Sequence, residues 1–192
     1  MKYFTYKLVA AANNWIEQSD SQLNNAEKRF WKTVTQYNLD LDILKPRINI
    51  TAWKFFRHGF AETGLHDGQL LSFNIGDGLR FVPDGKTPFL LNNQRSIARI
   101  EILNDEQIFH YVFEMHGLKN ATMNIVLDEF TGNKCIGDLF TYELSAFDDE
   151  YLRLGFLFAS GAEIEIIFRK LVYKRNRLKR NHDKNNIIAD TT

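Results

Sequence analysis

The spacing of apolar residues divides the chain into a helical part and a β-strand part. In residues 1 to 62, apolar side chains recur at every third or fourth position, which is typical of helices that bury one face. A first helix is expected to contain Phe4, Leu8 and Trp15. The buried face of a second, longer helix is expected to contain Leu23, Ala26, Phe30, Val34 and Tyr37.

Local signals mark where these helices begin and end. Ser19 and Gln22 have the three-residue spacing of a capping box, which predicts that the second helix begins after Ser19. Pro46 is expected to end that helix, because proline disrupts the backbone of a continuing helix. Asn49 is a favourable N-cap residue, so a short third helix with Trp53 on its apolar face is expected to follow it.

From Leu65 onward apolar residues alternate with polar ones, which predicts β-strands. The Gly76-Asp77-Gly78 turn is expected to join the first two strands in a hairpin, and Ala159-Ser160-Gly161 to join the last two. Residues 83–93 are expected to form a loop. The expected strands centre on residues 69–75, 79–81, 98–102, 109–115, 123–127, 140–144, 152–158 and 164–168.

No helical segment separates these strands, so the pattern favours antiparallel pairing over parallel crossovers. We predict an α+β fold in which N-terminal helices pack on a predominantly antiparallel sheet, curled into a sandwich or a partial barrel. Residues 1–173 are expected to form a single α+β domain, with a helical part at 1–62 and a β part at 65–173. Residues 174–192 are expected to form a basic, flexible tail.

Composition limits the class of protein. The chain has 192 residues, of which 44% are hydrophobic and 14% aromatic, which excludes a disordered or low-complexity protein. Its single cysteine, Cys135, excludes an intramolecular disulfide and an all-cysteine zinc site. The apolar stretches 8–12 and 154–162 are too short for a signal peptide or for the roughly 20 residues of a membrane span. We therefore expect a cytoplasmic protein.

Charge is distributed unevenly along the chain. The totals of 24 basic and 24 acidic residues cancel, but residues 169–192 contain eight basic and two acidic residues. The C-terminal segment therefore has a net charge of +6 and the rest of the chain −6. The basic residues Arg175, Arg177, Lys179 and Arg180 could bind the phosphates of a nucleic acid, or could form a solvated segment that aids solubility.

The sequence lacks the common catalytic signatures, including the Walker loop, the dinucleotide fingerprint, the G-x-S-x-G motif and the H-E-x-x-H motif. No catalytic residue, cofactor or metal site is predicted from these motifs. Candidate polar sites are therefore sought in groups of titratable residues.

One such group is formed by His110, Glu114 and His116, which fall on the same face of one expected strand. Glu114 and His116 are about 6.6 Å apart along the strand and could share a metal, whereas His110 is about 13 Å from Glu114. The alternative is the solvated polar face of a half-buried strand.

Two further groups contain acidic residues. His66 and Asp67 lie at the junction of helices and strands, where a turn would let them form an acid/base pair; an Asp-Gly turn alone also explains them. Glu143 would form an acidic surface for a basic partner or a cation if it met Glu163 and Glu165 across neighbouring strands. Otherwise these three are solvated positions.

A resemblance to a known family is carried by three parts of the chain. They are the opening Met1-Lys2-Tyr3-Phe4-Thr5, the Leu65-His66-Asp67 segment, and Tyr142-Glu143 followed by the hairpin from Tyr151 to Phe168. In these features the chain resembles an uncharacterised bacterial family of proteins with a domain of unknown function. The resemblance implies a bacterial cytoplasmic protein with helices first and a β-rich half after them. That family has no assigned activity, so the resemblance implies no mechanism.

Three classes of function are consistent with these features. The first is a non-enzymatic binding or interaction protein, such as an inhibitor or an immunity-type factor, with a protein partner held by exposed aromatic residues. The second is a hydrolase or small-molecule-binding protein with a site in the mouth of a curled sheet. The third is association with nucleic acid through the basic C-terminal residues.

Overall fold

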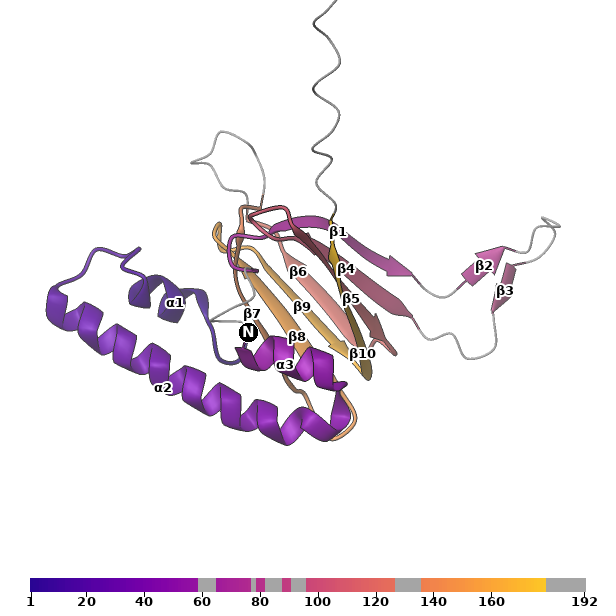
Figure 1. The fold of residues 1–192 in the computed structure, drawn as a ribbon, viewed down its shortest axis with the longest axis horizontal. Coiled ribbons are helices and arrows are strands. Elements are labelled where there is room, and N and C mark those ends of the chain that lie inside the picture. Colours follow the sequence, from indigo (N-terminus) through magenta and orange to yellow (C-terminus); the bar gives the residue numbers. More distant parts are fainter. Residues whose placement is uncertain (59–64, 77–78, 82–87, 91–95, 127–135, 179–192) are drawn as a thin grey trace, which may run out of the picture.

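The computed structural model describes residues 1–58, 65–76, 79–81, 88–90, 96–126 and 136–178. It confirms the α+β fold, with helices at the N-terminus followed by antiparallel strands (Figure 1). The helices are α1 (Tyr6–Ala12), α2 (Asp20–Leu44) and α3 (Ile50–His58), with a 3-10 turn at Lys45–Arg47. The strands are β1 (Gln69–Gly76), β2 (Leu79–Phe81), β3 (Pro88–Leu90), β4 (Ile97–Leu103), β5 (Phe109–His116), β6 (Asn120–Asn124), β7 (Leu139–Ala146), β8 (Leu152–Phe158), β9 (Glu163–Phe168) and β10 (Lys170–Arg177).

The predicted boundaries of the second and third helices are confirmed by their capping contacts, whereas the first helix, α1, is shorter than expected and contains neither Phe4 nor Trp15. The side-chain oxygen of Gln22 accepts a hydrogen bond from the backbone N–H of Ser19 at 2.9 Å, immediately before α2. Pro46 lies in the 3-10 turn that follows α2, where the helix ends. The side-chain oxygen of Asn49 accepts a hydrogen bond from the N–H of Ala52 at 2.7 Å. These contacts satisfy backbone donors at the first turns of α2 and α3, where no intrahelical partner exists.

Two four-stranded antiparallel sheets form the β part. The first sheet has the order β1-β4-β5-β10 and the second the order β6-β9-β8-β7. Along one side the chain passes directly from sheet to sheet, from β5 into β6 and from β9 into β10. Gly117 makes the bend between β5 and β6 with a φ of 69°, a conformation that favours glycine. On the other side Gly68 and Leu139 form an isolated bridge, so the sheets enclose a partial barrel.

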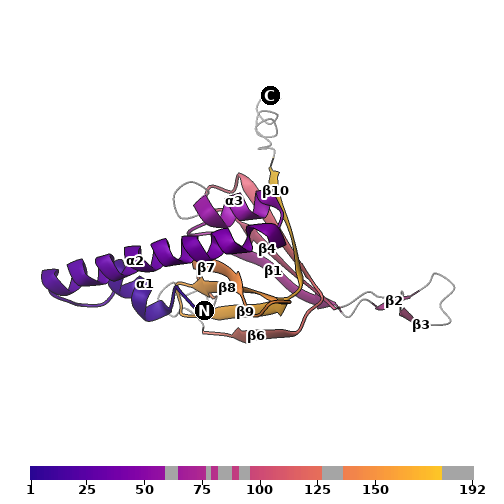
Figure 2. The same ribbon diagram turned by 90° about the horizontal axis from the view of Figure 1, so that it is seen from below.

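Alternating residues of both sheets fill the space between them, and α3 closes this core. Phe55 of α3 stacks on Tyr142 of the second sheet and Tyr173 of the first, with ring centres 5.2 and 4.6 Å apart. Its ring also contacts Tyr111 and Phe113 of β5. Phe55 therefore connects the helical part to both sheets in one aromatic cluster. Figure 2 shows α2 running along the sheets and continuing beyond them at its N-terminal end, where α1 packs on it.

The first predicted hairpin is wrong. β1 pairs with β4, so that Ile75 lies opposite Ala98, while β2 pairs with β3. β3 itself lies within residues 83–93, where a loop was expected. Leu71 and Ile75 alternate with polar residues, yet both are exposed, because β1 is an edge strand with an irregular register between Leu70 and Ser72. Alternation identifies a strand but does not select its partner.

The strand β10 continues beyond Tyr173, where the tail was expected to begin. Arg175 lies opposite Tyr111 and Arg177 opposite Phe109, and the N–H of Leu178 donates to the carbonyl of Ile108 at 2.7 Å. Residues 174–177 therefore belong to the first sheet. The remaining residues of the expected tail, 179–192, lie outside the described residues. In the described part of the chain, no helix combines the length and the apolar character needed to cross a membrane.

The position of Phe55 gives a prediction for stability. Replacing Phe55 with Ala removes a buried ring that packs on both sheets, so the free energy of unfolding is expected to fall by about 3–5 kcal/mol. Urea denaturation followed by far-UV circular dichroism measures this change. Lys54→Ala, on the exposed side of the same helix, is the matched control and is expected to change stability by less than about 0.5 kcal/mol. A loss below about 1 kcal/mol for Phe55→Ala would contradict the connecting role of the ring.

Candidate functional site

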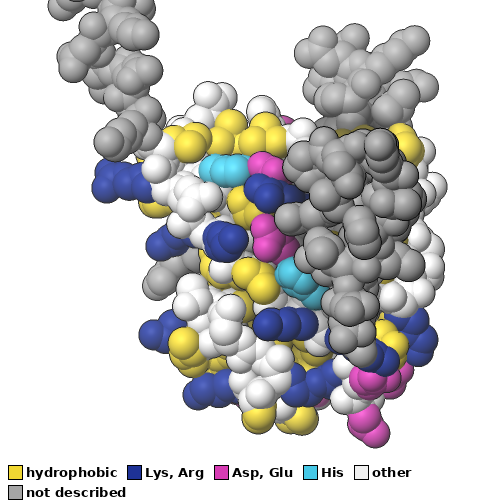
Figure 3. Space-filling view, turned by 90° about the vertical axis from the view of Figure 1, so that its right-hand side faces the viewer, with side chains coloured by type: hydrophobic (Ala, Val, Ile, Leu, Met, Phe, Trp, Pro, Cys, Tyr) yellow, Lys and Arg dark blue, Asp and Glu magenta, His cyan; other side chains and the backbone are white. Residues whose placement is uncertain are grey.

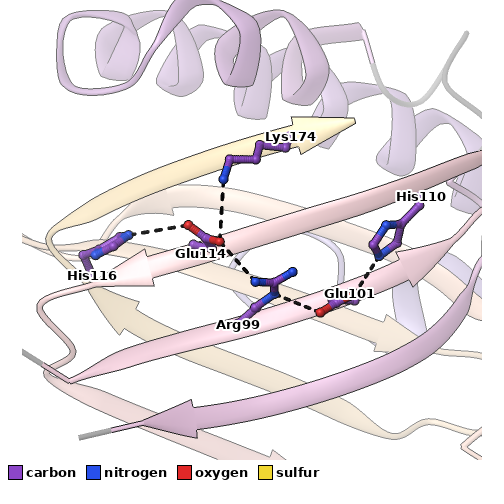
Figure 4. Close-up of polar contacts among 6 residues, drawn as sticks. All are labelled: Arg99, Glu101, His110, Glu114, His116 and Lys174. Carbon is purple, nitrogen blue, oxygen red and sulfur yellow. Dashed lines mark hydrogen bonds and ion pairs between the residues drawn. The ribbon is translucent and has the colours of Figure 1, made fainter. Parts of the chain in front are cut away.

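A network of charged side chains covers the outer face of the first sheet (Figure 4). Glu101 accepts from Arg99 Nε at 2.8 Å and lies 2.7 Å from His110 Nε2. Glu114 lies between 3.5 and 3.9 Å from nitrogens of Arg99, Lys174 and His116. Arg99 thus joins two carboxylates on neighbouring strands. Figure 3 shows acidic and histidine side chains together on this side of the molecule, with Lys and Arg side chains around them.

This network brings His110, Glu114 and His116 to one face of β5, as the alternation predicts. It does not bring them to one point, because His110 pairs with Glu101 whereas His116 approaches Glu114. Among the described residues no group of three or more histidine, cysteine or acidic side chains could hold a metal ion. Each carboxylate already has cationic partners within the network, so its direct effect is to stabilise cross-strand pairing.

Glu143 has a different environment from the one expected for a solvated position. It is fully buried, because residues 1–4 and α2 cover the outer face of the second sheet. Its carboxylate accepts hydrogen bonds from the backbone N–H groups of Lys2, Tyr3 and Phe4, the last two at 2.8 and 3.0 Å. A buried carboxylate is stable only when such donors surround it, and here the chain's own N-terminal backbone supplies them.

Glu143, Glu163 and Glu165 lie on neighbouring strands and converge around Met1. The Met1 ammonium donates a hydrogen bond to Glu163 and lies 3.6 Å from Glu165. The register places Glu143, Gly155 and Glu165 side by side, and a Cβ at Gly155 would lie 3.0 Å from Met1 Cγ. Glycine at this position therefore leaves room for the Met1 side chain. The cation that the acidic cluster binds is the chain's own.

The electrostatics of this segment follow from burial and charge. Burial lowers the pKa of the Met1 ammonium, but its hydrogen bond to Glu163 and the nearby carboxylates outweigh burial and raise that pKa overall. Tyr3 donates a hydrogen bond to Asp40 of α2. Burial and this bond raise the pKa of Tyr3, while the same bond lowers the pKa of Asp40. The N-terminal segment is thereby tied to both the second sheet and α2.

A cleft of about 320 Å³ lies between α1, α2 and the start of β7, and we call it the tryptophan pocket. Its apolar walls are Val9, Ala12, Phe30, Trp31 and Phe140. Its polar side chains are Asn13, Glu27, His66 and Thr141. Trp15 stacks on Phe140 with ring centres 4.0 Å apart, so a second tryptophan covers one side of that wall.

The His66 and Asp67 side chains meet at the edge of this pocket. Asp67 has a positive φ of 61° in a turn, and His66 Nδ1 lies 2.9 Å from its Oδ1. This is the turn geometry that the pair requires. Both side chains are largely exposed, and the one hydroxyl among the residues that line the pocket, that of Thr141, is buried. The described lining residues include no exposed nucleophile for this pair to activate.

His66 is a candidate from the sequence, but the two tryptophans at this pocket are not. Trp15 was expected within the first helix, but α1 ends at Ala12, and Trp15 is 49% exposed. Trp31 is 62% exposed, although the neighbouring Phe30 packs toward the core. Trp31 directly follows Phe30, which belongs to the buried face of α2. The helical periodicity of the sequence therefore places Trp31 outside that face. A larger cleft of about 590 Å³ between α1 and α2 is lined mostly by polar and charged residues, and none of its described lining residues is aromatic.

Of the basic C-terminal residues, Arg175 and Arg177 lie in β10. Arg175 lies over the Phe109 ring, 4.9 Å from its centre, and also hydrogen-bonds to Tyr111. Its guanidinium is therefore engaged with the first sheet. Lys179 and Arg180 lie outside the described residues. Comparisons of the chain with models of protein families, with curated proteins and with solved structures found no match.

The contacts of Glu143 predict a large effect of removing its charge. Glu143→Gln keeps the size of the side chain but replaces a charged acceptor of three backbone N–H groups with a neutral amide. We expect the free energy of unfolding to fall by about 1.5–3 kcal/mol, measured by urea denaturation. Glu106→Gln, at an exposed turn, is the control and is expected to leave stability unchanged. Equal stability of the two variants would show that Glu143 does not anchor the N-terminal segment.

The raised pKa of the Met1 ammonium predicts how stability depends on pH. A cation with a raised pKa in the folded state contributes fully below its unfolded pKa, near 8, and its contribution is lost as pH rises through the folded value. Wild-type stability is therefore expected to fall between pH 8 and pH 10, by more than that of Glu163→Gln. Urea denaturation across this range, with a free Met1 amino group, measures both slopes. Parallel slopes would contradict the assigned ion pair.

Proposed function

We propose that the protein is a non-enzymatic interaction protein that binds a protein partner through the tryptophan pocket. The observation that carries this proposal is the exposure of Trp31 and Trp15 around one cleft whose walls also include Phe30 and Phe140. Tryptophan is among the residues most often responsible for binding energy at protein interfaces, because its large ring loses much water-exposed surface on binding.

The place of the pocket in the fold supports this proposal. Its walls come from helices that are fixed to the second sheet, through Tyr3 to Asp40 and through Tyr37, whose hydroxyl accepts from the N–H of Leu144 at 3.2 Å. Rings held by a rigid framework lose little conformational freedom when a partner binds. By contrast, the carboxylates of the first-sheet network and the cluster around Met1 already have partners within the chain.

Substitution of Trp31 tests the proposal. Wild-type protein and Trp31→Ala are immobilised, exposed to an extract of the source organism, and the retained proteins are identified. We expect a protein that the wild type retains and Trp31→Ala loses; with that partner purified, the affinity of Trp31→Ala should be about 30-fold weaker or more. Leu39→Ala removes an equally exposed apolar residue from α2 away from the pocket and should bind as the wild type does.

Two results would reject the proposal. One is the absence of any partner that distinguishes wild type from Trp31→Ala. The other is a partner that Trp31→Ala and Leu39→Ala bind with the same affinity as wild type, because binding would then take place elsewhere on the molecule.

A further inference from the structure

On the basis of the proposed function, we infer that the tryptophan pocket receives an arginine side chain of the partner protein. In this arrangement the guanidinium lies against the Trp31 ring and pairs with the Glu27 carboxylate. Both residues are on α2, four positions apart, so they lie on the same side of the helix and both line the pocket.

The charges at the pocket favour a cation. Among the described residues that line it, Glu27 is the one acidic residue, and none is a lysine or an arginine. Within the described ranges Glu27 has no ion pair, unlike the acidic residues of the first-sheet network. Asp67, which holds His66 at the edge, adds a second carboxylate nearby.

At some other exposed or partly exposed aromatic rings, the chain itself supplies a cation. Lys45 lies 4.6 Å from the centre of the Trp53 ring, and Lys119 lies 4.7 Å from that of Phe147. Arg169 lies 5.0 Å from the centre of the Tyr151 ring and pairs with Glu150. In the part of the chain that the structure describes, no cation occupies the equivalent place over Trp31. The pocket thus has the ring and the carboxylate of this arrangement but lacks the cation.

Arginine fits the pocket better than lysine. A guanidinium is flat, stacks on aromatic rings and has five N–H donors, whereas a lysine ammonium is a point charge. The pocket offers several acceptors, namely Glu27, the Asn13 side chain and Thr141. The Thr141 hydroxyl belongs to a residue that is only 4% exposed, and it has no hydrogen-bond partner within the described residues. A volume of about 320 Å³ accommodates one such side chain.

Peptides test this inference without knowledge of the partner. The probes are acetyl-Gly-Gly-Arg-Gly-Gly-amide and the same peptide with citrulline, which has nearly the shape of arginine but no charge. Binding is followed by the NMR signals of the indole N–H groups. We expect the arginine peptide to shift the Trp31 signal saturably, with at least about tenfold higher affinity than the citrulline peptide. The Trp53 signal should not move, because Lys45 already covers that ring.

Variants complete the test. Glu27→Gln should weaken the arginine peptide by about five- to tenfold, whereas Glu106→Gln, an exposed glutamate far from the pocket in sequence, should not weaken it. Equal affinity for the arginine and citrulline peptides, equal affinity for a lysine peptide, or no effect of Glu27→Gln would each overturn the inference.

The two proposals fail separately. A partner that depends on Trp31 but binds Glu27→Gln normally, and tolerates replacement of its own arginines, removes the arginine inference and leaves the interaction function. The opposite outcome is that the pocket binds the arginine peptide selectively but the extract contains no partner that depends on Trp31. This outcome supports the arginine inference and rejects the proposed interaction function.

Discussion

The buried carboxylate of Glu143 determines how the helical part sits on the β part. A negative charge in the middle of β7 is stable only if hydrogen-bond donors enclose it, and the backbone N–H groups of Lys2, Tyr3 and Phe4 do so. This fixes the N-terminal segment in an extended form across the second sheet. Thr5, the next residue, caps α1, so the carboxylate also determines where α1 begins. The tryptophan pocket between α1, α2 and β7 exists because of that placement.

Two attachments hold the helices, and they have different chemistry. At one end the contacts of Glu143 and Met1 are polar, and the ion pairs of Met1 depend on the charge of its ammonium. At the other end Phe55 is held by stacking on Tyr142 and Tyr173. The apolar attachment joins both sheets and the polar one involves the second sheet alone. The polar attachment is therefore the part of the structure that pH changes most directly.

Much of the fold could be predicted from local patterns. The capping residues Ser19 and Asn49 and the proline at 46 mark helix boundaries because each acts on neighbouring backbone groups. The face of His110 and Glu114 followed from alternation along one strand. The pairing of β1 with β4 could not be predicted in this way, because a turn-forming Gly76-Asp77-Gly78 sequence is compatible with pairing to a more distant strand.

The candidate site was less accessible to prediction for the same reason. The burial of Glu143 depends on residues about 140 positions earlier in the chain, and no local pattern encodes such a contact. The position of Trp31 beside the buried stripe of α2 can be predicted from periodicity, but the cleft that it lines also needs Phe140 and Thr141 of β7, which lie far along the chain. His66 and Asp67 were an exception, because adjacent residues in a turn can meet through local geometry alone.

The attachment of Met1 to β9 also constrains the order of folding. Residues 1–4 are translated long before Glu143 and Glu163, the residues that bind them, so α1 and α2 leave the ribosome with no sheet to cover. The apolar faces of α1 and α2 that the sheet covers therefore stay exposed to water until the strands have been synthesised. Contacts between residues so far apart in sequence form slowly. The helices are therefore synthesised before the strands that they cover, and a shortened chain that ends before β7 would leave them exposed to aggregation.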